Sequence, residues 1–279
     1  MVIELATNPT PAVRPAAVAG MFYPEAPTLL AADVRAYLGA AAPSPQGAVR
    51  PKALIVPHAG YVYSGPVAAS AYARLAAVGD AIRRVVLFGP AHRVPVQGLA
   101  LPSAHAFATP LGMVRVDRDA VASALALPQV SSNDAAHAME HSLEVQLPFL
   151  QTVLREFCIV PFAVGDATPA QVAEVIELLW DGPGTLIVIS SDLSHYHRYR
   201  EARQIDQATA HAVLAFSATL QGEQACGAAP INGLLTAARR RGLKVELLDL
   251  RNSGDTAGDK SRVVGYASFA FGEASHART

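Results

Sequence analysis

The chain has 279 residues, of which 51% are hydrophobic and 16% are charged, and its formal net charge is -1. It is therefore more apolar and less charged than an average globular protein, which favours a large buried core and argues against disorder. Because 22 basic residues are balanced by 23 acidic ones, the charge gives no reason to expect a nucleic-acid partner.

The sequence contains no recognisable targeting signal, membrane span or cysteine framework. The first residues lack the basic start, apolar run and cleavage site of a signal peptide, and no apolar segment approaches the ~18 residues of a membrane span. Cys158 and Cys226 are far apart and form neither a disulfide framework nor a Cys-rich zinc motif. These features predict a soluble, cytoplasmic protein that does not associate with a membrane.

Short apolar runs alternate with longer amphipathic stretches along the chain, the pattern of βα units. In chain order the sequence predicts helix 28–38, strand 53–56, helix 66–77, strand 84–88, helix 119–127, helix 139–157, strand 159–164, helix 169–180, strand 186–189, helix 200–220, helix 230–241, strand 245–250 and strand 263–271. The strands are continuously apolar, so both faces of the sheet should be buried. We expect residues 1–13 to be a flexible lead-in and residues 14–279 to form a single α/β domain with a mainly parallel sheet.

Three of the predicted strands end in polar, titratable side chains. His58 follows the first strand, His92 follows the second and His195 follows the fourth. Ligands of open α/β sheets bind outside the carboxyl ends of the strands, so we expect these histidines to meet at one polar site. Any one of them alone could simply hydrogen-bond in a loop, but three in the same position favour convergence. Since imidazole is the commonest metal ligand in proteins, the site is predicted to bind a metal.

The neighbours of these histidines suggest different roles. His58 and His92 are the expected first pair of ligands, whereas Asp192 could orient a histidine or a bound water. His195, with an ordinary pKa of ~6.5, could act as an acid or a base. Cys226 precedes a predicted helix, whose dipole would favour a thiolate, although a small buried thiol is the alternative.

The segment 137–144 carries a further group of titratable residues. His137, Glu140, His141 and Glu144 lie at offsets of three and four, so a continuous helix would place them on one face. A solvated charged face is the alternative interpretation. The order of residues differs from the His-Glu-x-x-His motif of zinc proteases, and that chemistry is not expected.

Two other segments are expected near the site. Tyr63 closely follows His58 and could line the mouth of the same pocket. The Gly- and Asp-rich loop 252–262 is long for a connection between strands, and it is interpreted either as a lid or as a mobile hairpin tip.

Five motifs, in this order, resemble the Memo family, whose bacterial and archaeal branch is called AmmeMemoRadiSam system protein B. They are PHAGYVYSG (57–65), GPAH (89–92), EHSLEVQLPF (140–149), SSDLSHY (190–196) and CGAAPI (226–231). The resemblance runs from about Arg14 to about Phe271, which is nearly the whole chain. It implies a fold similar to the LigB-like class III extradiol dioxygenases, a three-layer α/β/α sandwich around a mixed, mainly parallel sheet.

The resemblance also implies roles for individual residues. The related dioxygenases hold non-heme Fe(II) with two histidines and one carboxylate. By motif, His58 and His92 match the metal histidines of the Memo family, and Cys226 matches its cysteine where the dioxygenases use glutamate. Asp192 and His195 match the family's Asp and acid/base His.

Glu140 and His141 match the Glu-His pair of the family and are expected to line the pocket. The implied function is an oxidoreductase that uses Fe(II), or alternatively copper, on an unknown small-molecule substrate. Because a thiolate is a softer ligand than a carboxylate, copper binding or redox chemistry is an alternative to ring cleavage. The alternative is a non-catalytic binding protein that serves a radical-SAM partner. A metal-independent hydrolase is disfavoured because no Gly-x-Ser-x-Gly elbow is present.

Overall fold

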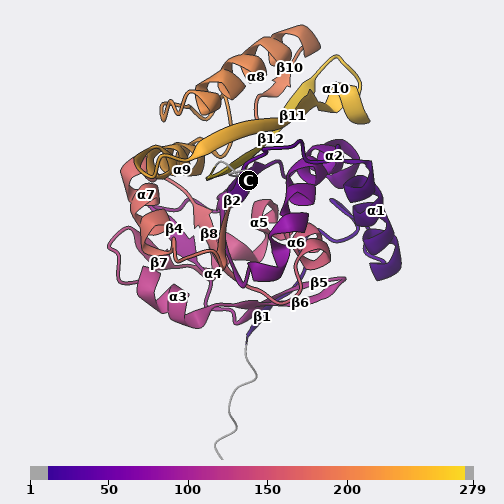
Figure 1. Ribbon diagram of the computed structural model, residues 1–279. Coiled ribbons are helices and arrows are strands. Elements are labelled where there is room, and N and C mark those ends of the chain that lie inside the picture. The colour runs from indigo at the N-terminus through magenta and orange to yellow at the C-terminus, as the bar shows by residue number, and fades with distance from the viewer. Residues whose placement is uncertain (1–11, 274–279) are drawn as a thin grey trace, which may run out of the picture.

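The computed structural model describes residues 12–273, which form a twelve-stranded open sheet with helices on both of its faces (Figure 1). The main path of the sheet runs in the order β1 (Val13–Arg14), β5 (Ala106–Thr109), β6 (Gly112–Val116), β8 (Cys158–Val164), β3 (Arg84–Pro90), β9 (Thr185–Ser190), β2 (Arg50–Val56), β12 (Val263–Glu273) and β10 (His195–His197). Off this path, β11 (Lys244–Asn252) pairs with β12, and β4 (Leu99–Leu101) pairs with β8 and with β7 (Val130–Ser132). The predicted α/β class with a mixed, mainly parallel central sheet is confirmed.

The helices connect and cover these strands. They are α1 (Pro27–Ala40), α2 (Tyr61–Tyr72), α3 (Arg118–Ala124), α4 (Asp134–Ala138), α5 (His141–Glu144), α6 (Leu147–Val153), α7 (Pro169–Leu178), α8 (Tyr199–Leu214), α9 (Ala228–Arg240) and α10 (Ser253–Thr256), with short 3-10 turns at Ala73–Ala77 and Gly79–Ala81. Within the described range, no helix has both the length and the apolar character needed to cross a bilayer.

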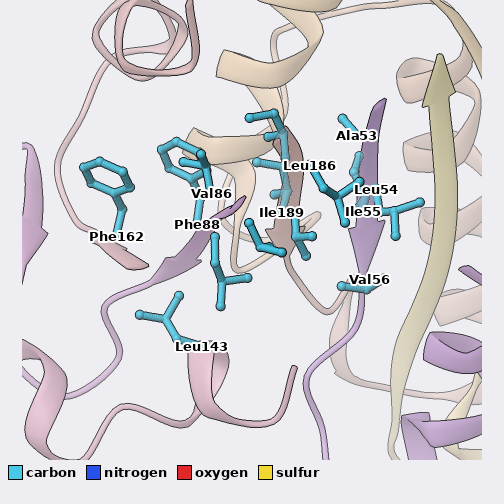
Figure 2. Close-up of a cluster of buried hydrophobic side chains, with 14 of the residues drawn as sticks. Ala53, Leu54, Ile55, Val56, Val86, Phe88, Leu143, Phe162, Leu186 and Ile189 are labelled. Atoms are coloured by element: carbon cyan, nitrogen blue, oxygen red, sulfur yellow. The ribbon is translucent and has the colours of Figure 1, made fainter. Parts of the chain in front are cut away.

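The four central strands β8, β3, β9 and β2 are parallel, and their side chains form the middle of the core. Leu54, Val86 and Ile189 are among the buried residues that pack there (Figure 2). Because helices cover both faces, these strands have no polar face, as their continuous apolarity predicted. Their shared direction brings the carboxyl ends of β2, β3 and β9 to the same edge of the sheet.

Three predicted helices differ from the observed ones. The helix predicted over 66–77 covers 61–72, so Pro66 lies inside α2 and not at its first turn. Tyr61, at the start of the helix, is buried against Phe149, and this packing favours the earlier start. The helix predicted over 200–220 ends at residue 214, because Phe216 has a φ of 54° and turns back to contact Phe271.

The continuous helix predicted over 139–157 is also wrong. The segment forms α5 and α6, which are separated by Val145 and Gln146, and α6 ends at Val153, with Leu154 in an extended conformation. Pro148 lies in the first turn of α6, where its missing N–H costs nothing. Gln146 points into the core and hydrogen-bonds there, so the break positions a polar side chain.

One terminal prediction falls partly outside the described residues. The predicted lead-in over 1–13 is described only at Ala12 and Val13. Val13 belongs to β1 and pairs with Ala106 of β5.

The loop predicted over 252–262 joins the antiparallel strands β11 and β12 and contains the helical turn α10.

Candidate metal centre

Three histidines meet at the carboxyl edge of the sheet. His58 follows β2, His92 follows β3 and His141 begins α5. Each can offer one ligand atom, and these atoms lie within 4.8 Å of one another. Nitrogens that share one ion are separated by about 3 to 4 Å, since each metal–nitrogen bond is ~2.1 Å long. The group is therefore close to the spacing of a mononuclear metal site.

The hydrogen bonds around His58 determine which of its nitrogens is free. Ser190 Oγ donates to the carbonyl of Ser142 at 2.6 Å and accepts from Nε2 of Gln146 at 2.8 Å. Its only proton is thus used, so it accepts from His58 Nδ1 at 3.0 Å. His58 Nε2 is left unprotonated and lies 3.3 Å from the Sγ atom of Cys226. Burial, with further contributions from His141 and other neighbours, holds the pKa of His58 well below its ordinary value.

His92 is oriented by Glu140, which is also the N-cap of α5. Glu140 Oε1 lies 2.9 Å from His92 Nδ1, and Oε2 accepts the backbone N–H of His92 at 2.6 Å. Burial alone would raise the pKa of Glu140, but hydrogen bonds from His92 and Ser142 outweigh it and lower the pKa to about 2. The ionised carboxylate fixes the proton on Nδ1 and leaves Nε2 of His92 as the free nitrogen. Carboxylates commonly orient metal-binding histidines in this way.

His141 contains the polar atom that most needs an explanation. Its Nδ1 is buried without a hydrogen-bond partner among the described residues, although Glu140 Oε1 lies 3.4 Å away. Burial lowers the pKa of His141 to about 4, so the ring is neutral at pH 7. The rings of His92 and His141 are stacked, with centroids 4.7 Å apart. A buried nitrogen without a partner, beside two oriented imidazoles, is consistent with a metal site.

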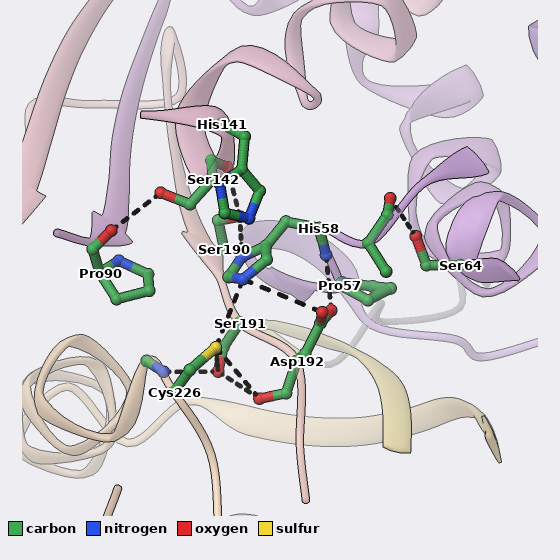
Figure 3. A network of polar contacts seen from close by, with 12 residues as sticks. Pro57, His58, Ser64, Pro90, His141, Ser142, Ser190, Ser191, Asp192 and Cys226 are labelled. Atoms are coloured by element: carbon green, nitrogen blue, oxygen red, sulfur yellow. Dashed lines mark hydrogen bonds and ion pairs between the residues drawn. The ribbon is translucent and has the colours of Figure 1, made fainter. Parts of the chain in front are cut away.

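Cys226 and Asp192 lie beside His58 (Figure 3). The Sγ atom of Cys226 lies 3.7 Å from the carbonyl oxygen of Asp192, and Asp192 Oδ1 accepts the backbone N–H of His58 at 2.7 Å. Burial raises the pKa of Asp192 to about 7. Burial, together with the nearby Asp192 carboxyl, raises the pKa of Cys226 to about 12. Without a cation, Cys226 is therefore a protonated thiol, and a metal would have to displace its proton.

A glycine allows Cys226 to come this close. Gly227 donates its backbone N–H to Ser191 Oγ at 2.9 Å. A Cβ atom on Gly227 would lie 2.6 Å from Ser191 Cβ, which real structures do not tolerate. The absence of a side chain at this position lets the segment before α9 lie against the end of β9.

The predicted acid/base His195 is near the cluster but outside the group of ligand atoms. It lies in β10, where it pairs with Val264, and the next residue, Tyr196, has a φ of 62°. Burial, and the charge that His92 would carry, lower the pKa of His195. The predicted pocket residue Tyr63 lies in the first turn of α2 and is exposed.

The predicted common face of His137, Glu140, His141 and Glu144 is wrong, because the helix is interrupted. His137 Nε2 bonds the carbonyl of Ala100 at 3.0 Å, and Glu144 forms a buried ion pair with Arg14. Only Glu140 and His141 reach the cluster.

Two supporting residues of the site were not predicted from the sequence. Ser190 and Gln146 orient His58, yet both look like ordinary strand or helix residues. Their only signal is their place inside two of the five motifs.

Comparison with known proteins identifies a family for the chain. A family profile described as "Memo-like protein" matches residues 14–270. A MEMO1 family protein of Aquifex aeolicus is 37% identical over 271 residues, covering 93% of this chain and 99% of its own. One of Archaeoglobus fulgidus is 38% identical over 271 residues, covering 91% and 97%. A third, of Methanosarcina barkeri, is 35% identical over 272 residues, covering 91% and 98%.

Proposed function

This chain belongs to the Memo family, and we propose that it is a metal-dependent oxidoreductase that uses Fe(II) or copper on a small molecule. The observation that carries the proposal is the orientation of His58 and His92. Each has its Nδ1 atom engaged by a hydrogen-bond partner, which leaves Nε2 free. Two imidazoles fixed in this way form a prepared pair of metal ligands.

We propose Cys226 as the third ligand and His141 as its neighbour in the site. The thiol is 3.3 Å from the free nitrogen of His58, so a small shift would let both atoms share an ion. A set of two imidazoles and one thiolate is softer than two imidazoles and a carboxylate, which favours copper as well as Fe(II). When bound, such an ion supplies Lewis-acid and redox chemistry.

Asp192 and His195 would accept and donate protons during the reaction. Asp192 has a pKa of about 7, so it can gain or lose a proton near neutral pH and offset a change of charge nearby. His195 is neutral at pH 7, since burial lowers its pKa, and it would therefore act first as a base. Asp192 is buried and His195 is half-buried, which limits the access of bulk water to these protons.

Metal binding can be tested without knowing the substrate. Anaerobically purified protein should contain Fe(II) or copper, and His58→Ala should abolish the metal content after reconstitution. The exposed His105 provides a matched control, because His105→Ala removes an imidazole far from the cluster motifs. If His58→Ala binds metal as well as the wild type does, the proposal is wrong.

The third ligand can be tested by spectroscopy. With Co(II) as the probe, a thiolate ligand gives a charge-transfer absorption that Cys226→Ser should remove, whereas His141→Ala should retain it.

Turnover is tested separately, by measuring oxygen consumption with a panel of small aromatic compounds. In His195→Ala this oxygen consumption should be lost while the metal is retained. Bound metal without any turnover would favour the non-catalytic alternative, a binding partner of a radical-SAM protein.

We also propose a cytoplasmic location, because both cysteines are free.

A further inference from the structure

A cavity lies at the opposite edge of the sheet from the metal centre. It has a volume of about 590 Å³ and is lined by residues from 50–52 at the start of β2, from 180–185 before and at the start of β9, and from 241–243 after α9. His58 follows the other end of β2, which has seven residues. At ~3.3 Å per residue, the two sites are roughly 20 Å apart. Nothing in the proposed metal chemistry uses this cavity.

The wall of the cavity contains the only tryptophan of the chain, Trp180. The guanidinium carbon of Arg241 lies 4.3 Å from the centroid of its ring system, and Nζ of Lys52 lies 5.1 Å from it. An aromatic surface and two cationic groups therefore occupy the same wall.

Lys52 holds this wall together. Its ammonium group donates to the carbonyl oxygens of Trp180, Gly182 and Thr185 at 2.8, 2.6 and 2.6 Å. These bonds use its three donors, so Lys52 contributes charge but has no N–H left for a ligand. Burial lowers its pKa to about 8, which still leaves the group mostly charged at pH 7.

Two other cations are available to a ligand. Arg50 and Arg241 both line the cavity, both are exposed, and neither forms an ion pair with another residue in the range 12–273. Among the described residues of the lining, Glu273 is the only acidic one, so their net charge is positive. The rest of the lining is mainly apolar and includes Val78 and Leu243.

We propose that this cavity binds a small anion carried on a flat apolar ring, such as an aryl phosphate or an aryl carboxylate. The ring would lie against Trp180 and the apolar wall. The anionic group would face Arg50 and Arg241, because guanidinium groups bind phosphate and carboxylate through paired hydrogen bonds. Its volume is within the ~300–1,000 Å³ that is usual for small-molecule sites.

The intrinsic fluorescence of Trp180 reports on this cavity alone, since the chain has no other tryptophan. Titration of the full-length protein with phenyl phosphate should change the emission in a saturable way. Benzyl alcohol, which has the ring without the charge, and inorganic phosphate, which has the charge without the ring, should each bind at least about tenfold more weakly. A tenfold weaker binding corresponds to a loss of ~1.4 kcal/mol of binding free energy for the missing ring or the missing charge.

Two adjacent arginines provide a matched pair of variants. Arg241→Gln should weaken phenyl phosphate binding by about tenfold, as judged by the midpoint of the titration. Arg240→Gln should leave it unchanged, because Arg240 pairs with Glu177 and does not line the cavity. His58→Ala should also leave it unchanged, and thermal unfolding would check that each variant is folded.

Three results would overturn the proposal. The first is the absence of any saturable change in fluorescence at millimolar phenyl phosphate. The second is equal binding of inorganic phosphate, which would indicate an adventitious ion only. The third is an equal effect of Arg241→Gln and Arg240→Gln on phenyl phosphate binding. Calorimetry of Trp180→Leu supplies a readout that does not depend on fluorescence. In that variant, the heat of phenyl phosphate binding should be lost, and undiminished heat would equally count against the proposal.

Discussion

Glu140 holds His92 at two points, through the backbone N–H at 2.6 Å and through Nδ1 at 2.9 Å. The same carboxylate caps α5, the helix that begins with His141. One buried side chain therefore sets the orientation of one cluster histidine and the position of another. This explains how His92, which follows β3, and His141, which begins α5, arrive at a common point although 48 positions separate His92 from Glu140.

Replacement of Glu140 should weaken metal binding more than it weakens the fold. In Glu140→Gln the charge that stabilises the His92 Nδ1 proton is lost, while an amide of the same size remains. Loss of such an orienting carboxylate usually costs 10- to 100-fold in metal affinity, and we expect about that change in a chelator competition assay. Glu177, which is half-buried and pairs with Arg240, serves as a control, since Glu177→Gln should have no effect on metal affinity. Unchanged affinity in Glu140→Gln would show that His92 needs no partner.

The close approach of Gly227 to Ser191 can be tested by one substitution that causes a clash and a second that relieves it. Gly227→Ala should lower metal affinity about tenfold or more, because the new Cβ would push Ser191 away and displace Cys226 with it. Removal of the opposing side chain in the double variant Gly227→Ala/Ser191→Gly should restore part of the loss. Metal affinity is measured for the wild type, for the single variant and for the double variant. Equal losses in the single and double variants would mean that the contact does not position Cys226.

The parts of the site that were predictable from the sequence are those that follow apolar strands. His58 and His92 come directly after runs that had to be buried, and the direction of parallel strands then brings them to one edge. His195 was expected there for the same reason, but the chain continues beyond Ser190 before it reaches β10, which moves the ring out of the ligand group.

His141 could not be placed from sequence periodicity. Its neighbours have helical spacing, and only the inward turn at Gln146 and the capping by Glu140 break the helix. Both features are long-range packing effects, because Gln146 bonds Pro57 and Ser190, which are distant in the sequence. Short strands such as β4 and β7 were missed for a related reason, since three-residue segments carry too little periodicity to be recognised.

The buried ion pair between Arg14 and Glu144 should dominate the stability of the amino-terminal segment. Glu144 also accepts the backbone N–H groups of Ala17 and Val18, at 2.8 and 3.0 Å. Glu144→Gln would leave Arg14 buried without a counter-charge, and we expect a loss of about 3–5 kcal/mol in the free energy of unfolding by urea.

The exposed pair of Arg155 and Asp80 is the comparison for this experiment, since both side chains are about four-fifths exposed. Asp80→Asn should cost less than ~1 kcal/mol in the same assay. In the double variant Arg14→Met/Glu144→Gln the uncompensated charge is gone, so its loss should be smaller than the sum of the two single losses. A cost for Glu144→Gln as small as that for Asp80→Asn would contradict the prediction.

Asp206 should give the protein a pH dependence that can be separated from the metal centre. It lies buried in α8, and its Oδ1 accepts the backbone N–H of Ser194 at 3.0 Å. Burial raises its pKa from 3.8 to about 6. Between these two pH values the folded protein holds a proton that the unfolded chain has released, so this group's contribution to stability falls as pH rises from about 4 to 6.

Asp206→Asn keeps an acceptor oxygen but cannot ionise. The unfolding free energy of the variant minus that of the metal-free wild type should therefore increase between pH 4 and pH 6, by about 2–3 kcal/mol, and stay constant above pH 7. Urea unfolding at several pH values measures this difference, with the exposed Asp119→Asn as the control for a general effect of lost charge. A difference that stays flat or decreases over this interval would mean that Asp206 is ionised in the folded protein throughout. In that case the bond from Ser194 would outweigh the cost of burying the charge, and a carboxylate would anchor the loop that leads to His195 throughout the interval from pH 4 to pH 6.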